Sequence, residues 1–523
     1  MSEHYVETDV LVIGCGIAGG IAALRLADAG LQVTVITAAQ EAQESNTLYA
    51  QGGIIYRGSQ DSAELLAQDL IQAGDGLNNR EAVRLLAEEG PPLLRAMLIE
   101  RLGVPFERQD GELLFTREAA HSTARILHVG DATGHAIESH IIRALREQPH
   151  ITLLTSHTAV DLLTPAHHSL NRLAVYDPPS CVGAYVYDQV RDRVIAYIAR
   201  KTILATGGLG QIFLHTTNPP GARGDGIAMA YHAGARIINA EYVQFHPTAF
   251  YYRDAARFLV TEAVRGEGGR LVNENGEPFM HKYAPKWKDL APRDVVARSI
   301  HLEMLAAGSK CVYLDLASHM SADQIRERFP TIYEKCREYG VDITRDLIPV
   351  VPAAHYFCGG VWADIWGRTN IHNLYAVGEV SCTGVHGANR LGSASLLEGL
   401  VWGWRAGEDA ARTIAEAPRF NPNDIPPWYD AGLAPADPAL IQQDMTSIKH
   451  IMWNYVGLVR SKRRLQRAYR DLRNLQYDIE EFYGTSKLSD ALIGLRNMVR
   501  AAIIVQRAAW ENRQSRGCHY RED

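Results

Sequence analysis

The first part of the chain alternates apolar and glycine-rich segments in an order that predicts a strand, a tight turn, a helix and a second strand. Residues 9–13 form a short apolar run, which is typical of a buried strand. The segment 14–19 is rich in glycine, and apolar positions then recur with helical spacing up to Gly30, which ends the helix. Residues 33–36 predict the next strand. These segments together predict one βαβ unit of a doubly wound sheet.

Two later segments repeat the strand pattern far from this first unit. Residues 171–205 become alternating and strand-like and lead into a glycine pair, and another buried strand is predicted near 373–379. The nucleotide-binding fold is therefore predicted to be interrupted by an inserted unit. The predicted domains are a discontinuous nucleotide-binding domain of residues 1–240 and 353–420 and a capping domain of residues 241–352.

The C-terminal part of the chain predicts long amphipathic helices. The proline-rich stretch 421–427 is typical of a linker. Beyond it, Leu458, Leu465 and Leu472 recur every seven residues, as expected for one face of a helix. We therefore expect a helical domain over 430–523. The expected fold class is α/β, a Rossmann-like domain interrupted by an α+β capping domain and followed by a C-terminal helical domain.

Composition and charge narrow the classes of function. The chain has 523 residues, too many for one hydrophobic core, and is 46% hydrophobic and 22% charged, as in a globular enzyme. Its net charge of −7 disfavours a protein that coats nucleic acid. The seven cysteines lack metal-ligand spacing, which predicts a reducing, cytoplasmic compartment and no metal site. The apolar run 10–24 is short and interrupted, so neither a secretory signal nor a membrane partner is expected.

The glycine-rich turn predicts a dinucleotide site. In Gly14-x-Gly16-x-x-Gly19 the first glycine permits the tight turn, the second lets a pyrophosphate approach the backbone, and the third lets helix and strand pack closely. The acid that usually ends the second strand is replaced by Thr37, whose hydroxyl can still bond a ribose. Glu379 is the better ribose or ribityl partner, and the alternative is an acid at the start of a helix.

An arginine-rich stretch at 460–473 lies in one of the predicted C-terminal helices. A solvated face, or packing against the acidic body, is the first interpretation. Steering of anionic substrates is the second and RNA binding the third. We expect no binding to nucleic acid.

Seven blocks, in order along essentially the whole chain, resemble the succinate dehydrogenase and fumarate reductase flavoprotein family. They are residues 45–53, 244–248, 261–269, 292–294, 352–356, 387–390 and 515–519. The resemblance implies that the Rossmann-like domain is an FAD-binding domain and that the substrate is a small dicarboxylate. The residues expected to bind FAD are Gly14, Gly16, Ile17, Ala18, Gly19, Thr37, Ser45, Asn46, Thr47, Ala50, Gln51, Gly52, Gly53, Ala205, Thr206, Gly207, Asp225, Gly378, Glu379, Arg390, Ser393, Ser395 and Leu396.

At two positions this chain differs from some members of that family, and these differences indicate the branch of the family that it resembles. Members that attach FAD covalently carry histidine where this chain has Asn46, and an amide cannot form that bond, so FAD is expected to be noncovalent. Members that oxidise succinate carry an apolar residue where Glu118 stands, whereas L-aspartate oxidases carry glutamate. The block 452–460 also resembles the L-aspartate oxidases. In those enzymes two glycines follow the glutamate, and Ala119-Ala120 replace them here. This replacement affects the loop geometry and so the direction in which the Glu118 side chain points.

A substrate with two carboxylates needs concentrated positive charge and hydrogen-bond donors. Taken alone, an arginine is more often a salt-bridge residue and a histidine a structural one. The resemblance instead assigns a catalytic role to five residues, namely Arg293, Glu118, His246, His355 and Arg390. It assigns substrate binding to Gln244, Thr261, His355 and Arg390. For Gln244 and Thr261 two roles are open: direct contact with the substrate, or shaping of the pocket.

The implied reaction is the oxidation of L-aspartate to iminoaspartate by hydride transfer to flavin N5, the first step of de novo NAD (quinolinate) biosynthesis. Glu118 is expected to bind the substrate ammonium and assist its deprotonation. Arg293 aligns with the proton donor of fumarate-reducing members. A guanidinium pKa above about 12 favours a mainly electrostatic role in aspartate oxidation. In fumarate reduction, Glu262 and Arg265 are the expected proton relay.

The expected electron acceptors are O2, which gives H2O2, and fumarate, and functional coupling to a quinolinate synthase is expected. Two rival functions stay open at this point. One is a succinate dehydrogenase or fumarate reductase flavoprotein subunit with an iron–sulfur partner at a membrane. The other is an RNA-binding flavoprotein that uses the basic helix.

Overall fold

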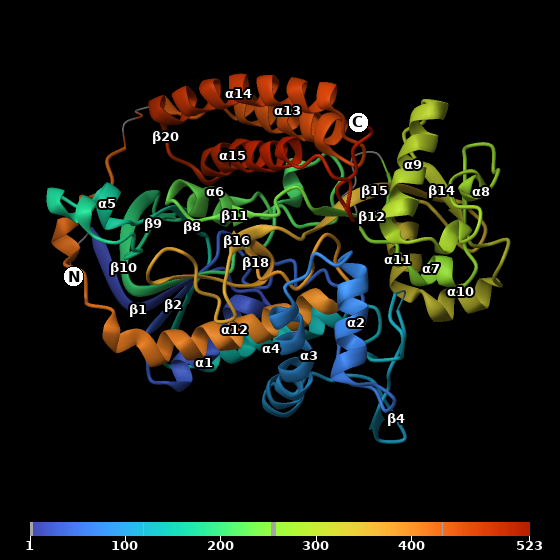
Figure 1. Cartoon of the computed structure of the whole chain (residues 1–523), viewed down its shortest axis with the longest axis horizontal. Coiled ribbons are helices and arrows are strands. Elements are labelled where there is room, and N and C mark those ends of the chain that lie inside the picture. The colour runs from blue at the N-terminus through green and yellow to red at the C-terminus, as the bar shows by residue number, and fades with distance from the viewer. Residues whose placement is uncertain (1–3, 119, 253–257, 431, 433) are drawn as a thin grey trace.

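A seven-stranded sheet forms the centre of the computed structural model, which describes residues 4–118, 120–252, 258–430, 432 and 434–523 (Figure 1). The strand order is β7-β2-β1-β10-β9-β8, and β17 pairs with the end of β10 on the edge opposite β1. The strands are β1 (Tyr5–Ile13), β2 (Val33–Ile36), β7 (Ile151–Leu154), β8 (His157–Leu162), β9 (Gly183–Asp188), β10 (Arg193–Leu204) and β17 (Leu374–Ala376). Strands β7, β2, β1, β10 and β17 are parallel, so their carboxyl ends meet at one edge.

The predicted βαβ unit and the fold class are confirmed. Residues Val10 to Ile13 are buried on both faces and pair with β2 on one side and β10 on the other. Helix α1 (Ile17–Asp28) follows the glycine turn, and Gly30 has a φ of +78°, which ends the helix. The strand pattern predicted over 171–205 is right for β9 and β10. It is wrong for residues 172–176, which form a 3₁₀ turn that Asn171 caps by accepting from the Leu173 N–H.

Helices cover both faces of this sheet. In Figure 1, α1, α4 (Thr133–Glu147) and α12 (Ala394–Thr413) lie below it, and the C-terminal helices lie above it. Helix α6 (Asp225–His232) contacts the C-terminal helix α15 on that upper side. The sheet therefore has a covered core on each face, as expected for a doubly wound fold.

The inserted unit has its own sheet and core. Its strand order is β12-β15-β14-β13, where β12 is Val243–Phe250, β15 Ile348–Phe357, β14 Val312–Asp315 and β13 Arg270–Val272. Its helices are α7 (Ala263–Gly266), α8 (Met280–Tyr283), α9 (Arg293–Ala307), α10 (Ala322–Arg328) and α11 (Pro330–Glu338). Strand β15 crosses the boundary predicted between 352 and 353. It carries the chain from the core of the inserted unit back to the nucleotide-binding unit.

Three helices form the C-terminal unit, α13 (Pro438–Val456), α14 (Lys462–Thr485) and α15 (Asp490–Glu511). Leu465 and Leu472 are buried on α14, as the heptad spacing predicts. Leu458 is not on a helix, because Gly457 ends α13 and Ser461 begins α14 as its N-cap. No helix in the described part of the chain is long and apolar enough to cross a membrane.

Shorter elements complete the fold. They are β3 (Ile54–Ile55), α2 (Ala63–Ala73), α3 (Arg80–Leu94), a π-helix (Arg95–Arg101), β4 (Arg108–Gln109), β5 (Glu112–Leu113), β6 (Ile126–Leu127), α5 (Pro165–His168), β11 (Ile237–Ile238), β16 (Gly360–Trp362), β18 (Ser381–Cys382), β19 (Ala434–Pro435) and β20 (Ser486–Lys487), with 3₁₀ turns at 172–176, 210–212, 288–290, 378–380, 414–416 and 422–424.

Candidate active site

The glycine turn after β1 brings backbone from two strands into contact. Gly14 has a φ of +106°, and a Cβ at this position would lie 2.2 Å from the Ala205 carbonyl oxygen. A Cβ at Gly19 would lie 2.0 Å from the Gly14 carbonyl oxygen, so only glycine fits at either position. Helix α1 has no side-chain cap at Gly16. The Ile17 N–H donates to Thr47 Oγ1 at 3.1 Å, and the other N–H groups of the first turn can face an anion, as a pyrophosphate site requires.

Three loops meet at the carboxyl edge of the sheet. The Asn46 Nδ2 donates to Glu379 Oε2 at 2.6 Å, and the Phe357 N–H donates to Glu379 Oε1 at 2.9 Å. A Cβ at Gly207 would lie 3.7 Å from the Asn46 Nδ2, so the loop after β10 lies against the same group. The alternative interpretation of Glu379, an acid before a helix that starts at Ser381-Cys382, is wrong because these two residues form strand β18; Glu379 itself lies in a 3₁₀ turn.

Burial raises the pKa of Glu379 from its ordinary 4.5 to about 7. The folded protein therefore binds more protons at this site than the unfolded chain between pH 4.5 and 7. The free energy of unfolding contributed by Glu379 falls as the pH rises through that range. Over the whole shift the effect is on the order of 3 kcal/mol, at about 1.4 kcal/mol per pKa unit.

We expect Glu379→Gln to remove this pH dependence. The Asn46 amide can turn over, because its Oδ1 has no partner among the described residues and can accept from the new amide. The measurement is urea unfolding of the FAD-free protein at pH 5 and pH 8. The variant should lose less stability than the parent between these two values, and an identical loss in both would contradict the pKa assigned to Glu379.

Several predicted FAD-binding residues hold buried polar atoms that lack a partner among the described residues. These atoms are Asn46 Oδ1, Gln51 Oε1 and Thr206 Oγ1. A buried polar atom without a partner is unfavourable by about 1–3 kcal/mol, so the three indicate a polar ligand. Together with the open first turn of α1, they fit a dinucleotide such as FAD.

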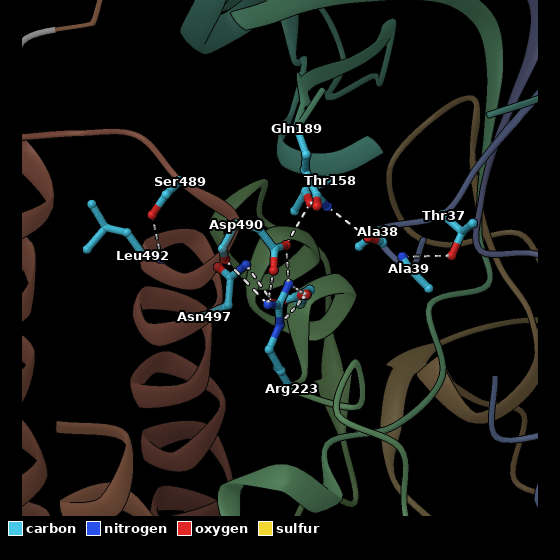
Figure 2. A network of polar contacts seen from close by, with 11 residues as sticks. Thr37, Ala38, Ala39, Thr158, Gln189, Arg223, Ser489, Asp490, Leu492 and Asn497 are labelled. Atoms are coloured by element: carbon cyan, nitrogen blue, oxygen red, sulfur yellow. Dashed lines mark hydrogen bonds and ion pairs between the residues drawn. The ribbon is translucent and has the colours of Figure 1, made fainter. Parts of the chain in front are cut away.

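A polar network extends from Thr37 toward Arg223 and Asp490 (Figure 2), and its hydrogen bonds also include Asp225. Asp225 Oδ2 accepts from Arg223, and its Oδ1 accepts from the Asn497 Nδ2 at 3.0 Å. Arg223 also pairs with Asp490 at 2.9 Å. The first turn of α6 is therefore tied to α15 of the C-terminal unit.

The same network continues to the end of β2. Thr158 Oγ1 donates to Asp490 Oδ1 at 2.7 Å, and Gln189 Nε2 donates to both Thr158 Oγ1 and the Ala38 carbonyl (Figure 2). Thr37, next to Ala38, accepts from the Ala39 N–H at 3.4 Å. Because the network joins five separate segments of the chain, no local pattern could have predicted it.

Two histidines face each other across the paired strands β12 and β15. The rings of His246 and His355 lie 5.4 Å apart between centroids. His246 Nδ1 accepts from the Thr248 N–H at 3.2 Å, and His355 Nδ1 shares a hydrogen bond with Thr217 Oγ1 at 2.9 Å. Burial lowers the pKa of both imidazoles well below the ordinary value, and the nearby arginines lower it further. At neutral pH both are therefore neutral, and His246 has its Nε2–H free to donate.

Gln244 holds Arg390 in place. The Arg390 Nε donates to Gln244 Oε1 at 3.2 Å, and the Gln244 Nε2 donates to Asn389 Oδ1 at 2.6 Å and to the Arg390 carbonyl at 2.9 Å. The Cys518 thiol donates to the same Asn389 Oδ1 at 3.1 Å. Both ends of the Gln244 amide are thus occupied by protein groups. This favours shaping of the pocket over direct substrate contact.

The Arg390 guanidinium itself is buried and has two further contacts. Its Nη1 donates to Ser395 Oγ at 3.0 Å, and its carbon lies 4.6 Å from the centroid of the Tyr356 ring. Thr261, the other residue left open, is half-buried, and its hydroxyl accepts from the Ala263 N–H at 3.5 Å. No described contact joins Thr261 to the arginines or histidines of the cluster.

Arg293 begins α9 and forms a chain of charges with Glu262, the residue before α7, and Arg265 on α7. Its Nε donates to Glu262 Oε2 at 2.6 Å, and Arg265 lies 3.4 Å from Glu262 Oε1. Burial alone would raise the pKa of Glu262, but Arg293 and Arg265 reverse this and lower it. The order Arg293, Glu262, Arg265 matches the proton relay expected for fumarate reduction.

Glu118 and Arg293 converge above one glycine. A Cβ at Gly392 would lie 2.7 Å from Glu118 Oε2 and 3.3 Å from Arg293 Nη2. The Ser393 hydroxyl donates to Glu118 Oε2 at 2.8 Å. Ala119 lies outside the described residues. Ala120 has a φ of +65°, a conformation that favours glycine and is unfavourable for alanine by about 1–2 kcal/mol.

Four residues that the sequence did not single out contact this cluster. They are His121, Thr217, Tyr356 and Asn389. Asn389 and Tyr356 lie inside blocks that carry the family resemblance, and proximity in sequence to Arg390 and His355 was the available signal. Nothing in the sequence pointed to Thr217.

Comparisons with known proteins match both parts of the molecule. A model described as an FAD binding domain matches residues 9–396, and one described as the fumarate reductase flavoprotein C-terminus matches residues 445–523. An L-aspartate oxidase 1 of Ralstonia nicotianae is 45% identical over 520 residues, which cover 98% of this chain and 95% of the relative. An L-aspartate oxidase of Pseudomonas aeruginosa is 43% identical, with 100% and 96% covered.

Solved structures agree with these matches. Quinol fumarate reductase of E. coli superposes with a TM-score of 0.88 at 28% identity, covering 99% of this chain and 92% of the other. Sdh1 of Mycobacterium smegmatis superposes with a TM-score of 0.83 at 31% identity, with 99% and 89% covered.

Proposed function

This chain belongs to the L-aspartate oxidases, a branch of the fumarate reductase flavoproteins, and we propose that it oxidises L-aspartate to iminoaspartate with noncovalent FAD as its cofactor. One observation carries the choice of substrate. The Glu118 carboxylate converges with Arg293 above Gly392, so a negative group stands among the cations of a dicarboxylate site. An amino dicarboxylate needs that group for its ammonium, whereas succinate does not.

The two arginines bind and orient the carboxylates. Arg390 offers a buried guanidinium whose direction Gln244 and Ser395 fix, and Arg293 offers its Nη2 near Glu118. His246 and His355 add neutral donors, so they bind carboxylate oxygens without taking a proton. Holding both ends of the substrate keeps its Cα in one place, which is the main requirement for hydride transfer.

Glu118 binds the ammonium and assists the loss of its proton. Glu118 is a partly exposed residue, which allows a proton taken from the nitrogen to pass on to solvent. The nitrogen lone pair released in this way drives hydride from Cα. When bound, FAD supplies the hydride acceptor, and its fit rests on the glycine turn, the open first turn of α1 and the unpartnered atoms of Asn46, Gln51 and Thr206.

The proposal also covers the electron acceptor, the metabolic partner and the location of the protein. We propose O2, with release of H2O2, or fumarate as electron acceptor, and functional coupling to a quinolinate synthase within NAD biosynthesis. A cytoplasmic location is favoured by the seven cysteines, which form no disulfide among the described residues. The arginines of α14 include Arg467 and Arg470, which lie beside Asp471 on the solvent face, and this supports a solvated surface over an RNA site.

The decisive assay compares two substrates. L-Aspartate should release peroxide in the presence of O2, and succinate should reduce an artificial dye slowly or not at all. Fast dye reduction by succinate with no oxidation of aspartate would instead identify a succinate dehydrogenase or fumarate reductase subunit. A gel shift with tRNA at physiological salt tests the remaining rival, and we expect none.

We predict that FAD is released when the protein is denatured. Asn46 stands where a covalent attachment would need a histidine, and its Nδ2 already donates to Glu379. Acid precipitation of the yellow protein should leave the flavin in the supernatant, where its absorbance is measured. Flavin that stays in the washed pellet would contradict noncovalent binding.

A further inference from the structure

A closed ring of hydrogen bonds holds Glu118. The Ser393 Oγ donates to Glu118 Oε2 at 2.8 Å, and Ser393 is joined by a peptide bond to Gly392. The Gly392 carbonyl accepts from His121 Nε2 at 3.1 Å. The His121 backbone N–H donates to the Glu118 carbonyl at 3.2 Å, which closes the ring. The side chain and the backbone of Glu118 are therefore fixed through the same few residues.

Ser393 is itself held in a single orientation. Its hydroxyl accepts from the Gly53 N–H at 3.3 Å, so the hydroxyl hydrogen is directed to Glu118. Its carbonyl accepts from the Ile55 N–H at 3.3 Å. Its φ of +58° is unfavourable by about 1–2 kcal/mol for a residue other than glycine, so the surrounding contacts must maintain it. Anything that shifts Gly392 therefore shifts the donor on which Glu118 depends.

His121 is the residue that anchors Gly392. Its side chain is 1% exposed, and Nε2 must carry the proton because a carbonyl can only accept. Burial lowers the pKa of the imidazole, which keeps it a neutral donor. Its Nδ1 has no partner among the described residues, so the bond to Gly392 is the one polar contact that the described structure gives the ring.

The loop that carries Glu118 and His121 has a separate attachment. Arg125 is fully buried and pairs with Asp61 at 2.9 Å and Asp69 at 2.8 Å. Ser122 donates to Asp69 through both its backbone N–H and its hydroxyl, at 2.9 Å each. This charged cluster keeps the loop in place independently of the imidazole. Replacing His121 should therefore change the aim of Glu118 without unfolding the loop.

We propose that His121 is a positioning residue that, through Gly392 and Ser393, fixes the Glu118 carboxylate against the substrate ammonium. His121 thereby contributes to the preference for a dicarboxylate substrate that carries an ammonium over a dicarboxylate that has none. This role rests on the proposed oxidation of L-aspartate. It differs from a merely structural role because it affects one substrate and not the other.

The test uses two variants of the FAD-loaded protein. His121→Gln keeps an N–H donor near the position of Nε2, whereas His121→Phe fills the space without a donor. For each, kcat/KM is measured for L-aspartate oxidation and for fumarate reduction, together with flavin content and Tm. We expect His121→Phe to lower the value for aspartate about three- to tenfold, the scale of one neutral hydrogen bond, and to leave fumarate within about twofold. His121→Gln should recover most of the loss.

A third variant shows whether the effect passes through Glu118. In a Glu118→Gln background, His121→Phe should lower aspartate oxidation much less than in the parent, because the carboxylate it positions is already absent. Equal losses for aspartate and fumarate, or an undiminished loss in the Glu118→Gln background, would overturn the proposal. If His121→Phe does not load FAD, His121→Met serves as the variant without a donor. The activity of the parent protein is measured first. A parent protein that does not oxidise aspartate would contradict the proposed function itself, whatever the variants show.

Discussion

Arg390→Leu is expected to lower kcat/KM for L-aspartate by roughly 30- to 5,000-fold, which corresponds to about 2–5 kcal/mol of transition-state binding. Arg390 is only 7% exposed, and Gln244 and Ser395 fix the direction of its guanidinium, so a substrate carboxylate paired with it would be held away from water. Removing it leaves that carboxylate buried without a counter-ion, and it leaves Gln244 Oε1 without its donor. The measurement is steady-state kinetics with aspartate.

The controls separate binding from folding. FAD should still be bound by Arg390→Leu, because most of the expected FAD-binding residues, among them the glycine turn and the loop that contains Asn46, lie on other segments. Arg405 is a matched control, since it is a buried arginine on α12 that pairs with Glu89 at 2.7 Å. Arg405→Leu should lower Tm and leave kcat/KM close to that of the parent. A normal kcat/KM in Arg390→Leu would rule out its assigned role.

Glu118→Gln is expected to lower kcat/KM for aspartate by about ten- to a hundredfold. An ammonium and a methylene differ by one positive charge, and the ion pair lost on removing the carboxylate is worth roughly 1.5–3 kcal/mol. The glutamine Oε1 can still accept from the Ser393 hydroxyl, so the shape of the loop is retained. Fumarate has no ammonium, and its reduction should change little. The ratio of the two changes in kcat/KM is the quantity to measure.

An exposed acid on the same segment provides the control for Glu118. Glu112 lies on β5, exposed to solvent, and Glu112→Gln should leave both activities unchanged. If Glu118→Gln instead lowers aspartate and fumarate activity together, Glu118 supports the loop rather than the substrate. The preference for aspartate over succinate would then lose its main structural support.

The elements that sequence reasoning predicted well are those governed by local rules. The glycine turn, helix α1 and strands β1 and β2 follow from spacing and sterics within thirty residues, and the structure shows them as expected. The errors also have local causes. Leu458 continues a heptad spacing across a helix end at Gly457, and Asn171 caps a 3₁₀ turn inside a stretch whose alternation resembles a strand.

The site itself could be predicted only in part. Arg293, Arg390, His246 and His355 were identified because each lies in a block that resembles known proteins, and the structure brings them together. The residues that aim these groups could not be predicted, since their partners are distant in sequence. Gln244 and Asn389 are 145 positions apart, and Asp225 and Asn497 are 272 apart. Such pairs are set by how the domains pack, not by any local pattern.

Residues 517 and 518 support the loop that contains Arg390 from a distant part of the chain. The Cys518 N–H donates to the Ala388 carbonyl at 3.0 Å, and a Cβ at Gly517 would lie 2.4 Å from that same oxygen. The ribosome therefore makes the backing of the Arg390 loop more than a hundred residues after the loop itself. A nascent chain already has the glycine turn and the Asn46 loop while the support behind Arg390 is still missing. The finished support of the Arg390 loop therefore requires the chain through residue 518.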